Sequence, residues 1–155
     1  MKPELNTYNY NMSTTQPIIG KEIAGKVIPL IQKAKVSIEI IVYDWRWYPN
    51  EPGINIQKFN NEIINAAKRN IIIKVIAEPE KTRQILNQNR AEAKKLISKK
   101  TIHTKLMLID KEITIIGSHN YTKNAFNLNE EVSIITDDKE TINRLKEYFD
   151  NLWSL

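Results

Sequence analysis

The chain has 155 residues, of which 41% are hydrophobic and 26% are charged, and these proportions are ordinary for a globular protein with one buried core. Because the chain contains no cysteine, disulfide bonds and thiolate metal sites are excluded. Its net charge of +5 weakly favours a polyanionic partner, such as nucleic acid or acidic lipid.

The N-terminal stretch MKPELNTYNYNMSTTQ is polar and lacks the apolar run of a signal peptide. No run of about 18 apolar residues occurs in the sequence, so we expect no membrane span. These observations predict a cytoplasmic protein and leave export of a trimmed chain open. We expect residues 1–16 to form an irregular arm and residues 17–155 to form a single domain.

Hydrophobic periodicity predicts that helices and strands alternate in the first half of the chain. A helix is expected from Pro17 to Ala34, and Pro29 should kink or break it. Two runs rich in β-branched residues, at 36–45 and 71–77, are expected to be strands. The second run is apolar enough to be buried on both faces of a sheet.

A helix is expected between these strands, marked by apolar residues from Ile56 to Ala67. It follows a loop at 46–53 that contains two prolines and a glycine. After the second strand, a charged helix is expected from Glu80 to Lys100, and its inner stripe includes Leu86 and Ile97.

The last part of the chain predicts three strands and a helix. The strands at 103–110 and 112–118 should form a hairpin, and 131–136 should be a further strand. The final helix is expected to be capped by Asp137 or Asp138. A βαβ unit followed by a hairpin predicts an α/β fold, in which a mixed β-sheet forms the middle of a three-layer α/β/α sandwich.

Two pairs of polar residues carry the chemistry that the sequence predicts. His103 and Lys105 are two apart on a predicted strand, so their side chains share a face about 6.6 Å apart. A neutral imidazole can act as a nucleophile or base and a lysine can hold an anion, which suits phosphate chemistry. Ser118 and Asn120 also share a face and can donate hydrogen bonds to phosphate oxygens. His119 points the opposite way and is interpreted as structural.

The spacing of these residues resembles the HKD motif of the phospholipase D superfamily. The six matching positions are His103, Lys105, Asp110, Gly117, Ser118 and Asn120. Asn129 and Glu131 resemble the Asn-x-Glu that follows the motif in that family. In size and in having a single motif, the chain is similar to the short bacterial endonucleases of the superfamily. The resemblance therefore implies a phospholipase D-like catalytic domain.

The chain departs from the family pattern in two places. The family usually has an extra strand or loop between the positions of Pro79 and His103, where the sequence here predicts only helix. The loop at 45–53 also looks longer than usual, and the family pattern assigns it no role.

The resemblance implies a symmetric homodimer in which two copies of the motif form one active site. One His103 would attack phosphorus and form a phosphohistidine, while the other would protonate the leaving oxygen and then activate water. Lys105, Ser118 and Asn120 would cradle the phosphate. Glu131 would accept the second ring N–H of a histidine, within or across subunits. No metal or other cofactor is implied.

Three further acidic or small residues are assigned from the same pattern. Asp110 is an odd number of positions from His103, so it is interpreted as tying down the hairpin rather than as a catalytic group. Gly117 removes a side chain where another group must approach closely. Glu130 is the rival of Glu131 as the orienting carboxylate, and Glu131 is favoured because it fits Asn-x-Glu.

Candidate substrate-binding residues flank the motif, each with two interpretations. Four lysines precede it and form either a solvated helix face or a basic wall along a phosphate backbone: Lys94, Lys95, Lys99 and Lys100. Trp45, Arg46 and Trp47 could stack unpaired bases, although core or dimer packing is an equal alternative for the two tryptophans.

These features together predict a metal-independent phosphodiesterase, and specifically a nuclease acting on DNA or RNA with a weak preference for single strands. One alternative is a phospholipase or phosphatidyltransferase acting on lipid phosphodiesters. Another is a nucleic-acid-binding dimer that cleaves nothing. Binding with steep salt dependence but without cleavage would indicate the last.

Overall fold

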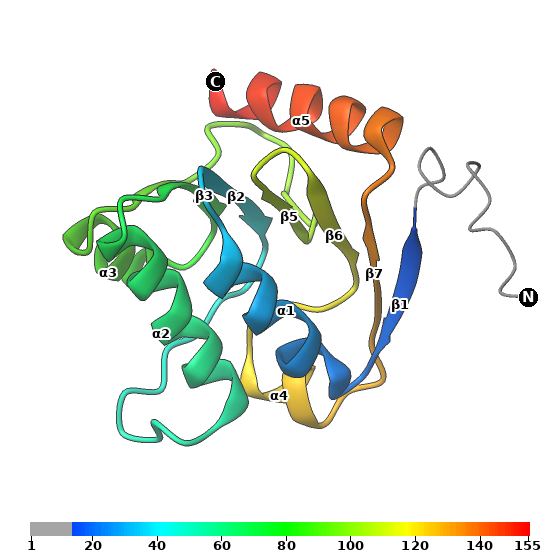
Figure 1. Cartoon of the computed structure of the whole chain (residues 1–155). Helices are drawn as coiled ribbons and strands as arrows, with labels where there is room; N and C mark the ends of the chain where they lie inside the picture. The colour runs from blue at the N-terminus through cyan, green and yellow to red at the C-terminus, as the bar shows by residue number, and fades with distance from the viewer. Residues whose placement is uncertain (1–13) are drawn as a thin grey trace, which may run out of the picture.

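A seven-stranded mixed sheet forms the middle layer of the protein in a computed structural model that describes residues 14–155 (Figure 1). The strands are β1 (Thr15–Ile19), β2 (Ser37–Val42), β3 (Ile72–Ala77), β4 (Glu92–Lys94), β5 (Leu106–Ile109), β6 (Ile113–Gly117) and β7 (Val132–Thr136). Their order is β1-β7-β6-β5-β2-β3-β4. β2, β3 and β4 are parallel, and every other neighbouring pair is antiparallel.

Helices cover both faces of this sheet. They are α1 (Glu22–Lys33), α2 (Asn55–Lys68), α3 (Glu80–Gln88), α4 (Lys123–Asn127) and α5 (Lys139–Trp153). α1, α2 and α4 pack on one face, while α5 lies alone across the other (Figure 1). The three-layer α/β/α sandwich with a mixed sheet is therefore confirmed. No helix in residues 14–155 has the length and apolar character to cross a bilayer.

The central strands are apolar on both faces because each face meets a different helix layer. In β5, Leu106 and Leu108 belong to the cluster that includes α5, whereas Met107 and Ile109 belong to the cluster that includes α1 and α2. All six residues of β2 are buried. Because these strands are fixed between two helix layers, they position the polar residues at their ends, such as Lys105 before β5 and Ser118 after β6.

The helix expected from Pro17 begins later and is not broken by its proline. Residues up to Ile19 form the edge strand β1, where a proline is tolerated because one side of the strand has no partner strand within residues 14–155. Gly20, with φ of +51°, turns the chain into α1. Pro29 lies inside α1, which continues to Lys33, since its apolar face is anchored on the sheet. Residues 1–13 of the expected arm lie outside the described residues.

The helix expected from Glu80 to Lys100 is wrong beyond Gln88. The Asn87 side chain accepts from the N–H of Ala93 (2.7 Å) and donates to its carbonyl (3.0 Å), which folds the chain back. Glu92–Lys94 then pairs with β3 as β4, and a loop leads to the motif. Ile97 is 81% exposed and is not part of an inner stripe. A short strand and a loop therefore stand where the sequence predicted only helix.

The β5–β6 hairpin is confirmed, with Asp110 and Lys111 both at φ of 56° in its turn. This is the backbone that a tight hairpin turn requires, and aspartate tolerates it better than most residues. Of the two candidate caps for the last helix, Asp138 caps α5 by accepting from the N–H of Thr141 (2.9 Å). β5 starts at Leu106, so His103 and Lys105 precede the strand instead of lying on it.

Candidate functional site

Five of the six motif residues lie at one edge of the sheet, and only Asp110 lies elsewhere. Ile41 near the end of β2 pairs with Leu106 at the start of β5, and Leu106 pairs with Ile116 near the end of β6. Gly117 in turn pairs with Ser133 near the start of β7. This antiparallel pairing brings segments 103–105, 117–120 and 129–131 to the same edge, although they are far apart in the sequence.

His103 and Lys105 are in direct contact at this edge. The Lys105 ammonium lies 3.1 Å from His103 Nδ1 and 3.4 Å from Nε2, and donates to the His103 carbonyl (2.8 Å). His103 is exposed, whereas Lys105 is only 8% exposed. Because an ammonium can donate only to an unprotonated ring nitrogen, the contact suits a neutral imidazole. A nucleophile and a cation are thus presented together.

The pKa of Lys105 depends on burial and on Glu131. Burial lowers the pKa of the Lys105 ammonium, and the negative charge of Glu131 raises it. The net effect is a pKa below the ordinary lysine value. Glu131 therefore influences the His103–Lys105 pair without contacting the histidine.

Glu131 is held by two neighbours of its own chain. The Ser118 hydroxyl donates to one carboxylate oxygen, and the Asn129 amide donates to the other (3.2 Å). Ser118 also accepts from the N–H of Val132 (3.0 Å). Within the described chain, Glu131 makes no hydrogen bond to His103 of the same subunit. Both arrangements predicted for Glu131, within and across subunits, stay predictions.

Asn120 joins the motif to the end of β2. Its Oδ1 accepts from the N–H of Asp44 (3.1 Å), and the backbone of Tyr121 exchanges hydrogen bonds with Asp44 and Arg46. The amide nitrogen of Asn120 makes no hydrogen bond to any described residue, so it can donate to a bound oxyanion.

Asp110 lies at the opposite edge of the sheet, as expected for a structural residue. Its carboxylate accepts from the backbone N–H groups of Lys35, Val36 and Ser37 at 2.7–3.2 Å. Burial raises the pKa of the Asp110 carboxyl, but these backbone hydrogen bonds together lower it by more than burial raises it. The net pKa is therefore below the ordinary value. Asp110 thus ties the hairpin to the start of β2.

Gly117 and His119 also have structural surroundings. A Cβ at Gly117 would lie 2.3 Å from Ser133 Cα, so the close approach expected at this glycine is that of β7. His119 is buried, with Nδ1 2.7 Å from the Ser133 hydroxyl and Nε2 2.9 Å from the Gly20 carbonyl. It links β7 to the turn before α1.

Two tyrosines that sequence reasoning assigned no role contact the motif. The ring centroid of Tyr43 lies 5.4 Å from that of His103, and the Lys105 ammonium lies 6.0 Å from the same ring. The Tyr148 hydroxyl of α5 lies 3.0 Å from the Thr104 hydroxyl. The sequence signal for Tyr43 was its position directly after β2, the strand that pairs with β5.

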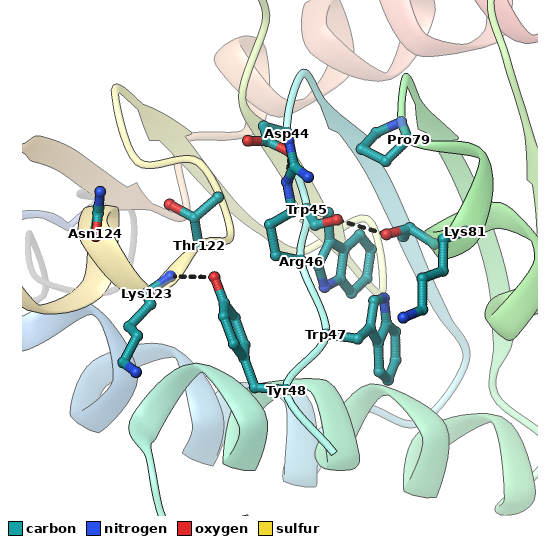
Figure 2. A pocket seen from close by; sticks show the side chains of 11 residues that line it. Asp44, Trp45, Arg46, Trp47, Tyr48, Pro79, Lys81, Thr122, Lys123 and Asn124 are labelled. Carbon is teal, nitrogen blue, oxygen red and sulfur yellow. Dashed lines mark hydrogen bonds and ion pairs between the residues drawn. The ribbon is translucent and has the colours of Figure 1, made fainter. Parts of the chain in front are cut away.

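The candidate substrate-binding residues divide into core and surface. Trp45 is fully buried and its indole N–H donates to Asn60 (2.6 Å), so it cannot stack a base, and this part of the prediction is wrong. The hydrogen-bonding asparagine makes the indole suited to the core. Trp47 and Arg46 instead line a pocket of about 610 Å³ (Figure 2).

The lysines before the motif lie on β4 and the loop after it, so the helix-face interpretation is wrong. Lys94 donates to the Trp153 carbonyl and stacks on its ring, and Lys95 pairs with Glu78 (3.4 Å). Lys99 and Lys100 are exposed and line a hollow of about 280 Å³ that also includes Tyr43.

Comparison with known proteins places these features in a family. The profile of the family described as "Cardiolipin synthase, PLD-like domain" matches residues 27–153. Among solved structures, NucT from Helicobacter pylori is similar with a TM-score of 0.76 at 24% identity, covering 92% of this chain and 97% of that one. A search of curated proteins found no match.

Two further solved structures share the fold. The phospholipase D family member Nuc from Salmonella typhimurium has a TM-score of 0.76 at 20% identity, covering 92% of this chain and 95% of its own. Phosphatidylserine synthase from Haemophilus influenzae has a TM-score of 0.69 at 12% identity, covering 92% of this chain and 39% of its own. At these identities the likeness shows the fold alone.

Proposed function

Because this chain belongs to the phospholipase D-like family, we propose that it is a metal-independent phosphodiesterase that cleaves DNA or RNA, with a slight preference for single strands. The observation that carries the proposal is the contact between His103 and Lys105, 3.1 Å apart at an exposed sheet edge. The likeness to Nuc and NucT, whose chains are similar in length to this one, supports a nuclease.

The proposed enzyme is a homodimer with one shared active site. A ring nitrogen of His103 attacks phosphorus, and the P–O bond to the leaving oxygen breaks. That oxygen takes a proton from His103 of the partner subunit. Water then attacks the phosphohistidine, loses a proton to the same partner histidine, and breaks the P–N bond.

Charge stabilisation in this proposal comes from Lys105 and Asn120 of both subunits. A partly buried ammonium is a stronger electrostatic partner than a solvated one because little water screens it. The unpaired amide nitrogen of Asn120 adds a neutral donor. Ser118 is bonded to Glu131 in the free protein, so it would act on phosphate only after exchanging that bond.

The test is incubation with single-stranded DNA, duplex DNA, RNA and phosphatidylcholine vesicles, each with excess EDTA. We expect cleavage of nucleic acid by the wild type and a loss of at least about 10³-fold in His103→Ala. Loss of cleavage on adding EDTA would overturn the metal-independent mechanism. An active monomer would overturn the shared site.

Two rival functions are separated by the same assay. The family description and the likeness to phosphatidylserine synthase favour a lipid phosphodiesterase, which would turn over the vesicles and spare the nucleic acids. If the protein only binds nucleic acid, the wild type and His103→Ala should bind it with equal affinity, and neither should cleave it.

A further inference from the structure

The loop at residues 45–48 forms one wall of the pocket of about 610 Å³, which the reaction proposed above does not use. Its lining includes Asp44 and Pro79, which follow the carboxyl ends of β2 and β3 (Figure 2). Arg46 and Trp47 come from the loop, Lys81 from the first turn of α3, and Lys123 from the first turn of α4. Three separate elements thus contribute cations to one hollow.

The loop is held rigidly by the residues behind it. Trp45 anchors it in the core, and its carbonyl accepts from the buried Thr82 hydroxyl (2.5 Å). Asn60 donates to the Arg46 carbonyl (2.9 Å), and Gln57 accepts from the N–H of Tyr48 (2.7 Å). A preorganised loop loses little conformational entropy when a ligand binds.

Two aromatic rings that pack at the margin of the core, Trp47 and Tyr48, also line the hollow. Trp47 is only partly buried and stacks on Trp45 with centroids 5.8 Å apart and an angle of 15°. Tyr48 is also partly buried, and its hydroxyl accepts from the N–H of Lys123 (2.9 Å). Figure 2 shows Trp47 beside Trp45 and Tyr48 beside Lys123. Such rings are platforms on which unpaired bases stack.

The charge around the hollow favours a phosphate. Its lining holds three cations, Arg46, Lys81 and Lys123, against the single carboxylate of Asp44. Lys123 also pairs with Glu51 (2.7 Å), which lies outside the lining, so Arg46 and Lys81 are the cations that face the hollow for a phosphate. Arg46 pairs with Asp44 (2.6 Å), but its side chain is 62% exposed, and such surface pairs exchange readily for another anion. Lys81 makes no hydrogen bond or ion pair through its ammonium to any described residue.

The hollow is continuous with the motif through shared lining residues. Asp44, Arg46, Pro79 and Lys81 also line a second hollow of about 420 Å³, and Tyr43 belongs to that one. Tyr43 also lines the hollow that contains Lys99 and Lys100, and its ring contacts His103. The three hollows together hold six cations and three carboxylates: Arg46, Lys81, Lys95, Lys99, Lys100 and Lys123 against Asp44, Glu78 and Glu80.

From these observations we infer that the hollow between the 45–48 loop, Lys81 and Lys123 binds one unpaired nucleotide of the strand that is cleaved at His103. The base stacks on Trp47, and Lys81 and Arg46 hold its phosphate. The inference rests on the proposed function and extends it by naming a second binding position and a single-stranded substrate.

The first test measures binding of a labelled single-stranded DNA oligonucleotide to His103→Ala protein, which prevents turnover. Lys81→Glu should weaken binding at least about fivefold and make the slope of log affinity against log salt about one unit shallower. The matched control is Lys139→Glu, another exposed lysine in the first turn of a helix, at the opposite edge of the sheet. Equal affinities of the two variants would overturn the inference.

The second test separates stacking from charge. Trp47→Leu should weaken single-strand binding at least about fivefold, and Trp47→Tyr should restore most of it because it keeps an aromatic face. Binding of a duplex, which offers no unpaired base, should be unchanged in both. If Trp47→Leu weakens the binding of single strands and of duplex equally, or if Trp47→Tyr does not restore single-strand binding, then no base stacks on this residue.

The third test distinguishes failure of this inference from failure of the proposed function. Bis(p-nitrophenyl) phosphate occupies only the catalytic edge, so Lys81→Glu should hydrolyse it at the wild-type rate while cleaving the oligonucleotide more slowly. A wild type that hydrolyses neither substrate refutes the proposed function, and the binding comparison still decides whether the hollow holds a nucleotide. A Lys81→Glu protein that loses both activities equally refutes the second binding position.

Discussion

Lys105 depends on a carboxylate that it does not touch. The charge of Glu131 raises the pKa of the Lys105 ammonium, against the lowering by burial. In Glu131→Gln the shape is kept and the charge removed, so the pKa of Lys105 falls further. If protonated Lys105 supports hydrolysis, the basic limb of the rate–pH profile moves to lower pH, measured with bis(p-nitrophenyl) phosphate between about pH 6 and pH 10.

The neighbouring carboxylate provides the control for this change. Glu130 is exposed, and burial and Glu131 account for the shift in the pKa of Lys105, so Glu130→Gln should leave the basic limb in place. A profile that is the same in Glu131→Gln and wild type would mean that Lys105 does not titrate in the reaction.

Asp110 is expected to contribute to stability and not to catalysis. Its folded-state pKa is lowered, so its stabilising effect is present above the ordinary value of 3.8 and is lost as the pH falls through the lowered value. Asp110→Asn tolerates the turn backbone but removes the charge. We expect a loss of about 1–2 kcal/mol in unfolding free energy at pH 7. This difference should shrink as the pH falls below 3.8 and through the lowered pKa.

Urea unfolding at several pH values measures the Asp110 effect. Glu112→Gln, at an exposed position two residues away, should change the unfolding free energy by less than about 0.5 kcal/mol. The rate of phosphodiester hydrolysis at a temperature where both proteins are folded should be unchanged in Asp110→Asn. A loss of rate without a loss of stability would make Asp110 a participant in the reaction.

The sequence alone predicted which polar residues meet, because fixed spacing on a hairpin determines which strand ends are adjacent. His103, Lys105 and Asn120 are at one edge, and Asp110 is at the other because β5 lies between them. The odd spacing predicted only that Asp110 has a structural role in the hairpin. The sequence could not predict which of the two tryptophans is buried. Trp45 and Trp47 are the same residue type two positions apart, so the sequence does not distinguish them. The indole of Trp45 lies in the core, where it donates to Asn60 of α2.

At the scale of elements, β7 leaves no room for a side chain on β6 at Gly117. A Cβ there would lie 2.3 Å from Ser133 Cα and 2.4 Å from the Val132 carbonyl oxygen, and backbone atoms cannot move aside separately. Gly117→Ala should therefore cost at least about 2 kcal/mol of unfolding free energy. It should also reduce activity, because Ser118 and Glu131 flank the two strands at this point.

A second glycine serves as the comparison for Gly117. Gly25 lies in α1, and a Cβ there would meet no atom within 4 Å. Gly25→Ala should leave stability unchanged or raise it by up to about 1 kcal/mol, since alanine is the better helix former. Thermal unfolding of both variants gives the measurement. Equal melting temperatures would mean that β6 and β7 can separate freely.

Elements with a strong period were predictable and short edge strands were not. The central strands and α5 have apolar patterns that match their burial. β4 has three residues, two of them charged, and its lysine-rich surroundings favour a helix by propensity. Only pairing with β3 and the side chain of Asn87 make it a strand. β1 likewise depends on β7, which is more than a hundred residues away.

At the scale of the whole molecule, one chain presents half of the proposed active site. Each subunit contributes one His103, while the proposed reaction needs one histidine as nucleophile and one as acid. A dimer of wild type and His103→Ala should therefore be inactive, provided that two subunits share one site. Independent sites predict a different result, since each wild-type subunit would keep its own activity.

Unfolding and refolding mixtures of the two proteins distinguish these arrangements. With a shared site, activity should follow the square of the wild-type fraction, so an equal mixture keeps about a quarter of the activity. Independent sites would keep about half. Mixing wild type with Asp110→Asn provides the control, because both chains carry an intact motif edge and should keep full activity. A linear decline with His103→Ala would require a complete site within one subunit, and the acid would then have to be sought among the neighbours of His103, beginning with Lys105 and Tyr43.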